Sequence, residues 1–221
     1  MLEHGRRVLT AIVRWPAAWL VRRRVPPNVV TAAGTVLFCA ATLSTIPWGW
    51  LVVGPPLMGL TVLTDGLDGH MARATHPTKF GAFLDSTLDR VADGVMAGCV
   101  VFWLAQRPDA QGLVWSGAPA GWVAATRGLW LAVGLVALVT GQVIPYARAR
   151  AESLGLDGRG GLTGRADRVL ITCLALFLAG LGAPYALEAG VALMAVLGVV
   201  TVAQRMVKAA RSGAPASEGS A

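Results

Sequence analysis

Long apolar stretches, separated by short segments with polar residues, glycine or proline, run from residue 28 to residue 208. A helix of about 20 apolar residues is long enough to cross the hydrocarbon core of a bilayer, which is roughly 30 Å thick. Six stretches approach this length, so the pattern predicts an all-α membrane protein with six transmembrane helices. The expected helices are 29–46, 48–72, 80–105, 121–146, 166–182 and 185–207.

The first 27 residues predict an amphipathic helix that lies in the membrane interface on the cytoplasmic side. Apolar side chains between Val8 and Val13 recur at helical spacing, opposite three arginines, as in a helix that lies in the headgroup plane. Prolines 26 and 27 are expected to end this helix, and Asn28 is a candidate cap for the first span. The small, polar residues 209–221 predict a disordered cytoplasmic tail. We therefore expect one membrane domain between these segments, over residues 28–208.

Composition and charge support a membrane location. The chain is 55% hydrophobic and only 14% charged, outside the usual range of soluble proteins. Of the 19 Lys and Arg residues, all but Arg107 and Arg127 fall on loops and ends expected to be cytoplasmic, as the positive-inside rule requires. We therefore expect a multi-pass protein of the cell membrane with both termini in the cytoplasm. The net charge of +7 fits an anionic lipid surface better than it fits nucleic acid. The three cysteines lack CxxC spacing and so do not indicate a zinc site.

Four aspartates interrupt the second and third predicted spans. A carboxylate in the bilayer is costly unless it serves a site, so intramembrane acids indicate function. Asp65 and Asp68 are three residues apart, and Asp85 and Asp89 are four apart, so each pair shares one helix face. A short cytoplasmic connection makes the two helices antiparallel and lets all four carboxylates converge. Carboxylate-only ligation suits Mg²⁺ or Mn²⁺, and two bridged ions would leave positions open for phosphate oxygens.

Small residues accompany the aspartates. Gly69, Ala72 and Gly81 leave adjacent helical positions bare, which admits a bulky ligand but equally suits close helix packing. Two alternatives to a metal-dependent enzyme also stay open at this point. One is a structural carboxylate cluster held by neighbouring arginines, and the other is a divalent-cation channel or carrier, which would spread its acids across the depth of the bilayer.

The pattern D-x2-D-G-x2-A-R, followed by seven residues and G-x3-D-x3-D, resembles the motif of the CDP-alcohol phosphotransferase family. The resemblance implies that Asp65, Asp68 and Asp85 bind two divalent ions and that Asp89 is both a ligand and the base. A carboxylate beside the metals is a reasonable acceptor for the proton that an attacking hydroxyl loses. The segment 28–31 also resembles a P-[DN]-x-x-T element of the family. The implied contacts to CDP-diacylglycerol are Asn28, Val29, Val30, Thr31, Gly69, Ala72, Arg73, Thr78 and Gly81.

Arg73 offers a permanently charged fork for a diphosphate. The connection from Arg73 to Gly81 is one residue shorter than is usual in the family, which affects the assignment of Thr78. Asp93 continues the stripe of Asp85 and Asp89 along the third span, and we expect it to pair with a neighbouring side chain.

Residues 80–93, F-G-A-F-L-D-S-T-L-D-R-V-A-D, look like one branch of the family, the actinobacterial phosphatidylinositol phosphate synthases. The stretches 146–152, 165–168 and 203–205 resemble the same branch. This resemblance implies transfer of the phosphatidyl group of CDP-diacylglycerol to a hydroxyl of inositol 1-phosphate (1D-myo-inositol 3-phosphate), with release of CMP. It also implies a homodimer.

Three arginines give this interpretation an independent argument. An acceptor that already carries a phosphate needs a cationic pocket, and Arg148, Arg165 and Arg205 stand at three cytoplasmic helix ends, where they could surround one dianion. Positive-inside anchoring also explains arginines there. Glycerol 3-phosphate needs cations too, so a phosphatidylglycerophosphate synthase stays open, as does a phosphatidylinositol synthase that uses free inositol.

Overall fold

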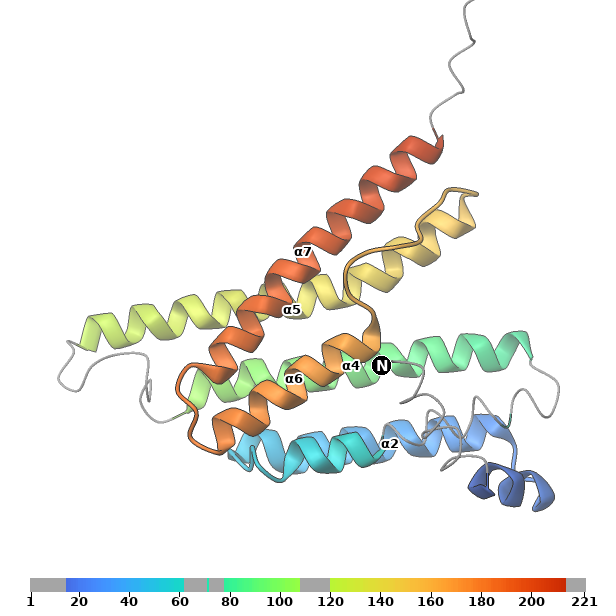
Figure 1. Ribbon diagram of the computed structural model, residues 1–221, viewed down its shortest axis with the longest axis horizontal. Helices are drawn as coiled ribbons and strands as arrows, with labels where there is room; N and C mark the ends of the chain where they lie inside the picture. Colours follow the sequence, from blue (N-terminus) through green and yellow to red (C-terminus); the bar gives the residue numbers. More distant parts are fainter. Residues whose placement is uncertain (1–14, 62–70, 72–77, 108–119, 214–221) are drawn as a thin grey trace, which may run out of the picture. The chain divides into compact units, whose positions relative to one another are not determined.

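The computed structural model describes residues 15–61, 71, 78–107 and 120–213, and every regular element within these residues is helical (Figure 1). Short helical segments cover residues 15–22 and 54–61. The prediction of an all-helical protein is therefore confirmed for this part of the chain. The remaining elements are α2 (Pro27–Thr45), the 3-10 helix η1 (Ile46–Trp48), α4 (Lys79–Gln106), α5 (Ala120–Ser153), α6 (Arg165–Gly180) and α7 (Ala186–Gly213).

Most helix bounds follow the apolar pattern closely, with three differences. Helix α7 continues beyond the expected end at residue 207 to Gly213, so the expectation of disorder from residue 209 is not met by residues 209–213, which are helical. The second predicted span starts late, because Gly49 has a φ of 77° and a turn separates η1 from the helix at residue 54. A side chain at Gly49 would also meet the ring of Trp103, 2.6 Å from an ideal Cβ. Helix α5 continues beyond the expected end at residue 146, because an i,i+4 ion pair between Arg148 and Glu152 supports its polar last turns.

Two prolines determine how α2 begins. Pro26 is the N-cap residue, with extended dihedral angles, and Pro27 occupies the first helical position. The expectation that Asn28 caps this helix is wrong, because Asn28 already lies inside it. Proline suits the first position since its fixed φ matches the helix and its missing N–H has no intrahelical partner there. The Asn28 side chain is thereby available for contacts elsewhere.

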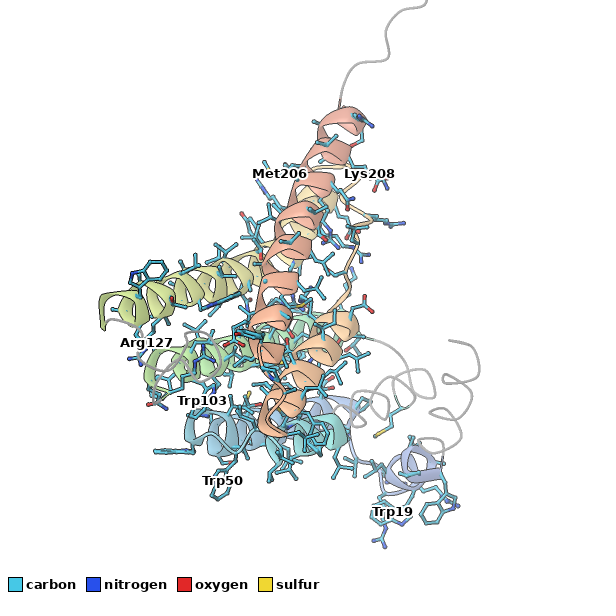
Figure 2. The ribbon with its side chains drawn as sticks, turned by 60° about the vertical axis from the view of Figure 1, so that its left-hand side comes forward. Trp19, Trp50, Trp103, Arg127, Met206 and Lys208 are labelled. Atoms are coloured by element: carbon cyan, nitrogen blue, oxygen red, sulfur yellow. The ribbon has the colours of Figure 1, made fainter. Side chains whose placement is uncertain are left out.

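The helix at residues 15–22 ends before these prolines. Arg24 adopts a left-handed conformation with a φ of 57°. The amides of Arg24 and Val25 donate to the carbonyls of Val21 and Leu20, which is the Schellman arrangement that closes many helices. Trp19 is exposed on this short helix with the Arg23 guanidinium 5.2 Å from its ring centroid (Figure 2). An interfacial helix over residues 1–27 stays a prediction, since residues 1–14 lie outside those described.

Three of the described helices are long and apolar enough to cross a membrane. Their bounds are Pro27–Trp48, Gly121–Ser153 and Ala186–Gly213. Helix α6 has only 16 residues, and α4 carries four charged side chains in its first half. The arrangement with six spans therefore stays a prediction. The three cysteines are all free thiols, as expected.

The chain forms two compact units. One comprises Met1–Trp103 with Leu176–Gly182, and the other comprises Leu104–Ala175 with Ala183–Ala221. In the second unit α5 and α7 lie side by side (Figure 1). Small residues make close packing possible there: an ideal Cβ at Gly198 would lie 2.2 Å from the hydroxyl of Thr140. The two helices therefore meet where one of them has no side chain.

An ion pair fixes the start of α7 in the second unit. Glu188, in the first turn of α7, pairs with Arg107, which follows the last residue of α4. The two side chains are only 5% and 12% exposed. Arg127, on α5, donates from Nη2 to the Arg107 carbonyl at 3.3 Å (Figure 2). The two cations that the positive-inside rule assigns to the far side are thus both used to join helix ends.

We expect Glu188→Ala to lower the free energy of unfolding by about 3–5 kcal/mol, because it leaves the Arg107 charge buried without its partner. Reversible unfolding of the purified protein in detergent, followed by circular dichroism, measures the change. The double variant Arg107→Met, Glu188→Leu is the control, since an apolar pair of similar size restores most of the loss. Equal destabilisation of the single and double variants would contradict the assignment.

Candidate active site

An acidic stripe runs along the first half of α4. Gly81, Asp85, Asp89 and Asp93 follow one another at intervals of four residues, so they share one face of the helix. Asp85 is exposed and the Asp89 side chain is 23% exposed, whereas Asp93 is buried. Asp65 and Asp68, the other two expected metal ligands, lie outside the described residues. Asp85 and Asp89 are the two expected metal ligands that the structure describes. Both therefore present accessible carboxylate oxygens on one face of α4.

Arg90 contacts the last two members of this stripe, Asp89 and Asp93. Its Nη1 atom lies 3.5 Å from Asp93 Oδ2, and its Nη2 atom lies 3.9 Å from Asp89 Oδ2. The prediction that Asp93 pairs with a neighbour is thus confirmed. The contact to Asp93 is the shorter of the two, and the Asp93 carboxylate is the more buried.

The start of α4 brings together residues that are distant in the sequence. The Thr78 hydroxyl accepts the backbone N–H of Gly81 at 2.9 Å, which is the N-cap interaction that begins many helices. An ideal Cβ at Gly81 would lie 3.1 Å from Asn28 Oδ1 and 3.0 Å from Thr78 Oγ1. Three of the expected nucleotide contacts, Asn28, Thr78 and Gly81, therefore lie together, one helical turn before Asp85.

The other expected nucleotide contacts are described only in part. Val29 is 55% exposed, and Val30 and Thr31 are half-buried in the first turn of α2. The Thr31 hydroxyl donates to the Pro27 carbonyl at 3.2 Å. Gly69, Ala72 and Arg73 lie outside the described residues, so their expected role stays a prediction.

The second unit contains a cluster of arginines around the end of α5. Arg205 Nη1 donates to the carbonyl of Ile144, which lies about one helical turn before Arg148 on α5, so Arg205 of α7 meets α5 close to Arg148. Arg205 donates from Nε to the Gly160 carbonyl at 2.9 Å and from Nη1 to the Ile144 carbonyl. Arg148 is half exposed, and its Nε donates to Glu152 Oε1 at 3.0 Å. The expected pocket members Arg148 and Arg205 are thus brought together.

Arg165 and Arg168 occupy the first turn of α6, and both are half-buried. Arg165 was the expected third member of the pocket, and Arg168 was not. The charge of Arg168 is the one that acts on Arg205. The helical spacing of three residues places both arginines on neighbouring positions of α6, so the sequence offered no basis for choosing between them.

The loop between α5 and α6 is attached to the end of α7. No pattern in the sequence indicated these contacts. Lys208 Nζ lies 3.0 Å from Asp157 Oδ2 and donates to the Arg159 carbonyl at 3.1 Å (Figure 2). The Asp157 amide donates to the Ser212 hydroxyl at 2.9 Å. Gly155 and Gly160 have φ values of 73° and 100°, which let the loop turn back. These contacts join positions that are about 50 residues apart.

Asp157 is ionised at neutral pH in this loop. The pKa of its carboxyl is lowered because it accepts the backbone N–H of Arg159, and further because Lys208 lies beside it. A lowered pKa in the folded state means that the contribution of this carboxylate to stability is present at neutral pH and is lost as the pH falls through that pKa. These contacts therefore hold the loop at neutral pH.

Comparisons with known proteins agree with the motif. The family model described as CDP-alcohol phosphatidyltransferase matches residues 24–154. The phosphatidylinositol phosphate synthase of Corynebacterium glutamicum is 37% identical over 211 residues, which are 95% of this chain and 89% of that protein. The enzyme of the same name from Mycobacterium tuberculosis is 37% identical over 209 residues, 90% of this chain and 84% of that protein.

Solved structures give the same result. The crystal structure of the Mycobacterium tuberculosis phosphatidylinositol phosphate synthase with CDP-DAG bound matches with a TM-score of 0.78 and 34% identity, over 94% of this chain and 96% of that one. Its complex with manganese and citrate also has a TM-score of 0.78, over 93% and 90%. The family model covers more than half of the chain, and the relatives align over most of their length. This chain belongs to the CDP-alcohol phosphatidyltransferase family.

Proposed function

We propose that this protein transfers the phosphatidyl group of CDP-diacylglycerol to a hydroxyl of an inositol phosphate, giving phosphatidylinositol phosphate and CMP. The observation that carries the proposal is that the chain has both an accessible aspartate stripe on α4 and a separate cluster of arginines around Arg148 and Arg205. The first suits metal-dependent phosphoryl chemistry, and the second suits an acceptor that already bears a phosphate. The relatives named phosphatidylinositol phosphate synthase support this choice of acceptor.

The aspartates fit divalent metal ions by the chemistry of their donors. Carboxylate oxygens are hard ligands that Mg²⁺ and Mn²⁺ prefer, and Asp85 and Asp89 are accessible from one face of α4. We assign both, with Asp65 and Asp68, as ligands of two such ions. Bound there, the ions would offset the charge of the diphosphate during transfer. A solved structure of a relative in complex with manganese supports this assignment.

Asp89 has a second role in the proposal. The oxygen of the acceptor hydroxyl forms a bond to the phosphatidyl phosphorus while the bond from that phosphorus to CMP breaks. The hydroxyl proton passes to the Asp89 carboxylate. The partial exposure of Asp89 and its long contact to Arg90 leave this carboxylate able to accept a proton.

The nucleotide part of the donor is assigned to the start of α4. Gly81 has no side chain, which lets the polar side chains of Asn28 and Thr78 lie against the start of α4, where they can contact a ligand together. Val29, Val30 and Thr31 continue this surface along the first turn of α2. Gly69, Ala72 and Arg73 complete the assignment, with the Arg73 guanidinium as the partner of the diphosphate. The relative crystallised with CDP-DAG supports this assignment.

The acceptor phosphate is assigned to Arg148, Arg165 and Arg205. Arg148 is half exposed and so can turn toward a ligand. Arg205 uses Nε and Nη1 for backbone carbonyls, and the guanidinium has further N–H groups on Nη2 for a phosphate.

The proposed topology has six spans in a cell membrane, with both termini and the active site at the cytoplasmic face. Residues 1–27 would form an interfacial helix and residues 28–208 the membrane domain, and the disordered tail would begin only after the end of α7 at Gly213. The three apolar helices support a membrane location. We further propose a homodimer.

A competition assay tests the proposed function. Purified protein receives CDP-diacylglycerol, Mg²⁺ or Mn²⁺, and equal amounts of inositol 1-phosphate, free inositol and glycerol 3-phosphate, and the lipid products are identified by mass. We expect phosphatidylinositol phosphate as the main product, with CMP released in equal amount. Asp89→Asn is the control, since an amide cannot take the proton, and we expect it to lower kcat at least 100-fold. Phosphatidylglycerophosphate as the main product would contradict the assigned acceptor.

Gly81→Ala tests the nucleotide assignment. The added Cβ would crowd Asn28 and Thr78 at 3.1 and 3.0 Å, so we expect the KM for CDP-diacylglycerol to rise about 10-fold, the cost of roughly one hydrogen bond. The KM for the acceptor stays unchanged. Gly98→Ala is the matched control, because Gly98 lies on the same helix with open space at its Cβ position. Equal effects of the two variants on the donor KM would refute the assignment.

Arg148→Ala tests the acceptor assignment. Loss of a charge-assisted hydrogen bond to a phosphate is expected to raise the KM for inositol 1-phosphate about 10- to 100-fold with little change in the KM for CDP-diacylglycerol. Arg150→Ala provides a control that removes an equal charge two residues further on α5, which is roughly 200° around the helix. Steady-state kinetics with each substrate varied in turn distinguish the two. The assignment fails if Arg150→Ala has the larger effect.

A further inference from the structure

Glu152 is surrounded by cations that come from separate parts of the second unit. Its Oε1 atom accepts a hydrogen bond from Arg148 Nε at 3.0 Å and another from Arg159 Nε at 3.4 Å. The negative charge of Glu152 also acts favourably on the Arg205 guanidinium. One carboxylate oxygen thus joins an arginine of α5 to an arginine of the following loop, next to the cluster assigned to the acceptor phosphate.

The other carboxylate oxygen lies beside an open pocket. Both described contacts of Glu152 fall on Oε1, and the side chain is 41% exposed. The pocket has a volume of about 440 Å³ and is lined by Glu152, Gly155, Leu156, Asp157 and Arg159. Its mouth is wide and its lining is mainly polar. A polar, hydroxyl-bearing group therefore fits the pocket better than an acyl chain does.

Glu152 affects a bound anion in two opposite ways. A phosphate that binds Arg148 must displace or share the carboxylate that already holds this side chain, and it comes close to a like charge. A ligand that also presents hydroxyl groups can donate them to Oε2, since an ionised carboxylate only accepts hydrogen bonds. Such charge-assisted bonds are stronger than neutral ones. A phosphate that brings no hydroxyl group to the pocket experiences only the repulsion by Glu152. A phosphate whose ring hydroxyls reach the pocket also gains hydrogen bonds to Oε2.

We propose that Glu152 is a specificity-determining residue that favours inositol phosphates, whose ring can present several hydroxyls to the pocket at once, over glycerol 3-phosphate, which is shorter and carries only two. The inference rests on the proposed function, in which Arg148 binds the acceptor phosphate. Glu152 binds ring hydroxyls through Oε2 and disfavours phosphates that bring no hydroxyls to the pocket. Discrimination of this kind depends on a repulsive element as well as an attractive one.

The test is Glu152→Gln, which keeps the size of the side chain and removes its charge. The ratio of kcat/KM for inositol 1-phosphate to that for glycerol 3-phosphate is measured in both proteins, and calorimetry gives the Kd of inorganic phosphate. We expect the ratio to fall about 10-fold, the Kd of inorganic phosphate to decrease several-fold, and the KM for CDP-diacylglycerol to stay unchanged. Glu152→Asp, a shorter carboxylate that keeps the charge, should lower the ratio without tightening inorganic phosphate.

Asp167→Asn is the matched control for loss of one negative charge. Asp167 lies in the first turn of α6, where its Oδ2 atom accepts the Gly164 amide at 2.9 Å, a contact that asparagine can keep. We expect this variant to change the affinities for all phosphates in parallel and to leave the acceptor ratio unaltered. An equal change of the ratio in both variants would show a general effect of charge and overturn the inference.

Two further outcomes decide the matter. If Glu152→Gln weakens inorganic phosphate, inositol 1-phosphate and glycerol 3-phosphate by the same factor, Glu152 only orders the arginines, and the inference is wrong. The same holds if the ratio does not change. A wild-type protein that makes no phosphatidylinositol phosphate would instead refute the proposed function, so failure of the inference alone is recognised by normal wild-type activity with an unaltered ratio.

Discussion

A charge within a membrane protein must find an opposite charge, a polar backbone group or a ligand, and the described charged side chains follow this requirement. Arg107 pairs with Glu188, Arg90 pairs with Asp93, and Arg205 donates to two backbone carbonyls. Asp85 and Arg148 are more exposed, although Arg148 also contacts Glu152, and both are among the groups to which ligands are assigned. Arg205 has both roles, because the guanidinium that donates to two backbone carbonyls is also assigned to the acceptor phosphate.

The apolar pattern predicted most helices well because the length of an apolar run depends only on local sequence. It was wrong for Asn28, since two prolines in succession leave two possible starts for α2, and it missed the turn at Gly49. The spacing of the aspartates predicted a common face on α4, which the helix confirms for Asp85 and Asp89. The family motif placed Asn28 and Gly81 at one ligand, in agreement with their closeness, whereas nothing in the sequence indicated that Lys208 meets Asp157.

The arginine cluster shows why a set of like charges needs a carboxylate among them. Arg148, Arg168 and Arg205 carry like charges that repel one another. Glu152 offsets part of this repulsion by contacting Arg148 and Arg159. The loop at residues 154–164 is in turn attached to α7 by Arg205 and Lys208. The electrostatic balance and the shape of this region thus depend on the same few side chains.

The ion pair at the start of α7 also has a consequence for how the protein is made. Arg107 and Glu188 are 81 positions apart, and a ribosome that adds 5–20 residues per second needs roughly 4–16 s to synthesise the intervening chain. During that interval the arginine has been made and its glutamate has not. Assembly of this unit is therefore completed only after the start of α7 has been made, and a chain that ends before α7 carries Arg107 without Glu188, its partner in the complete protein.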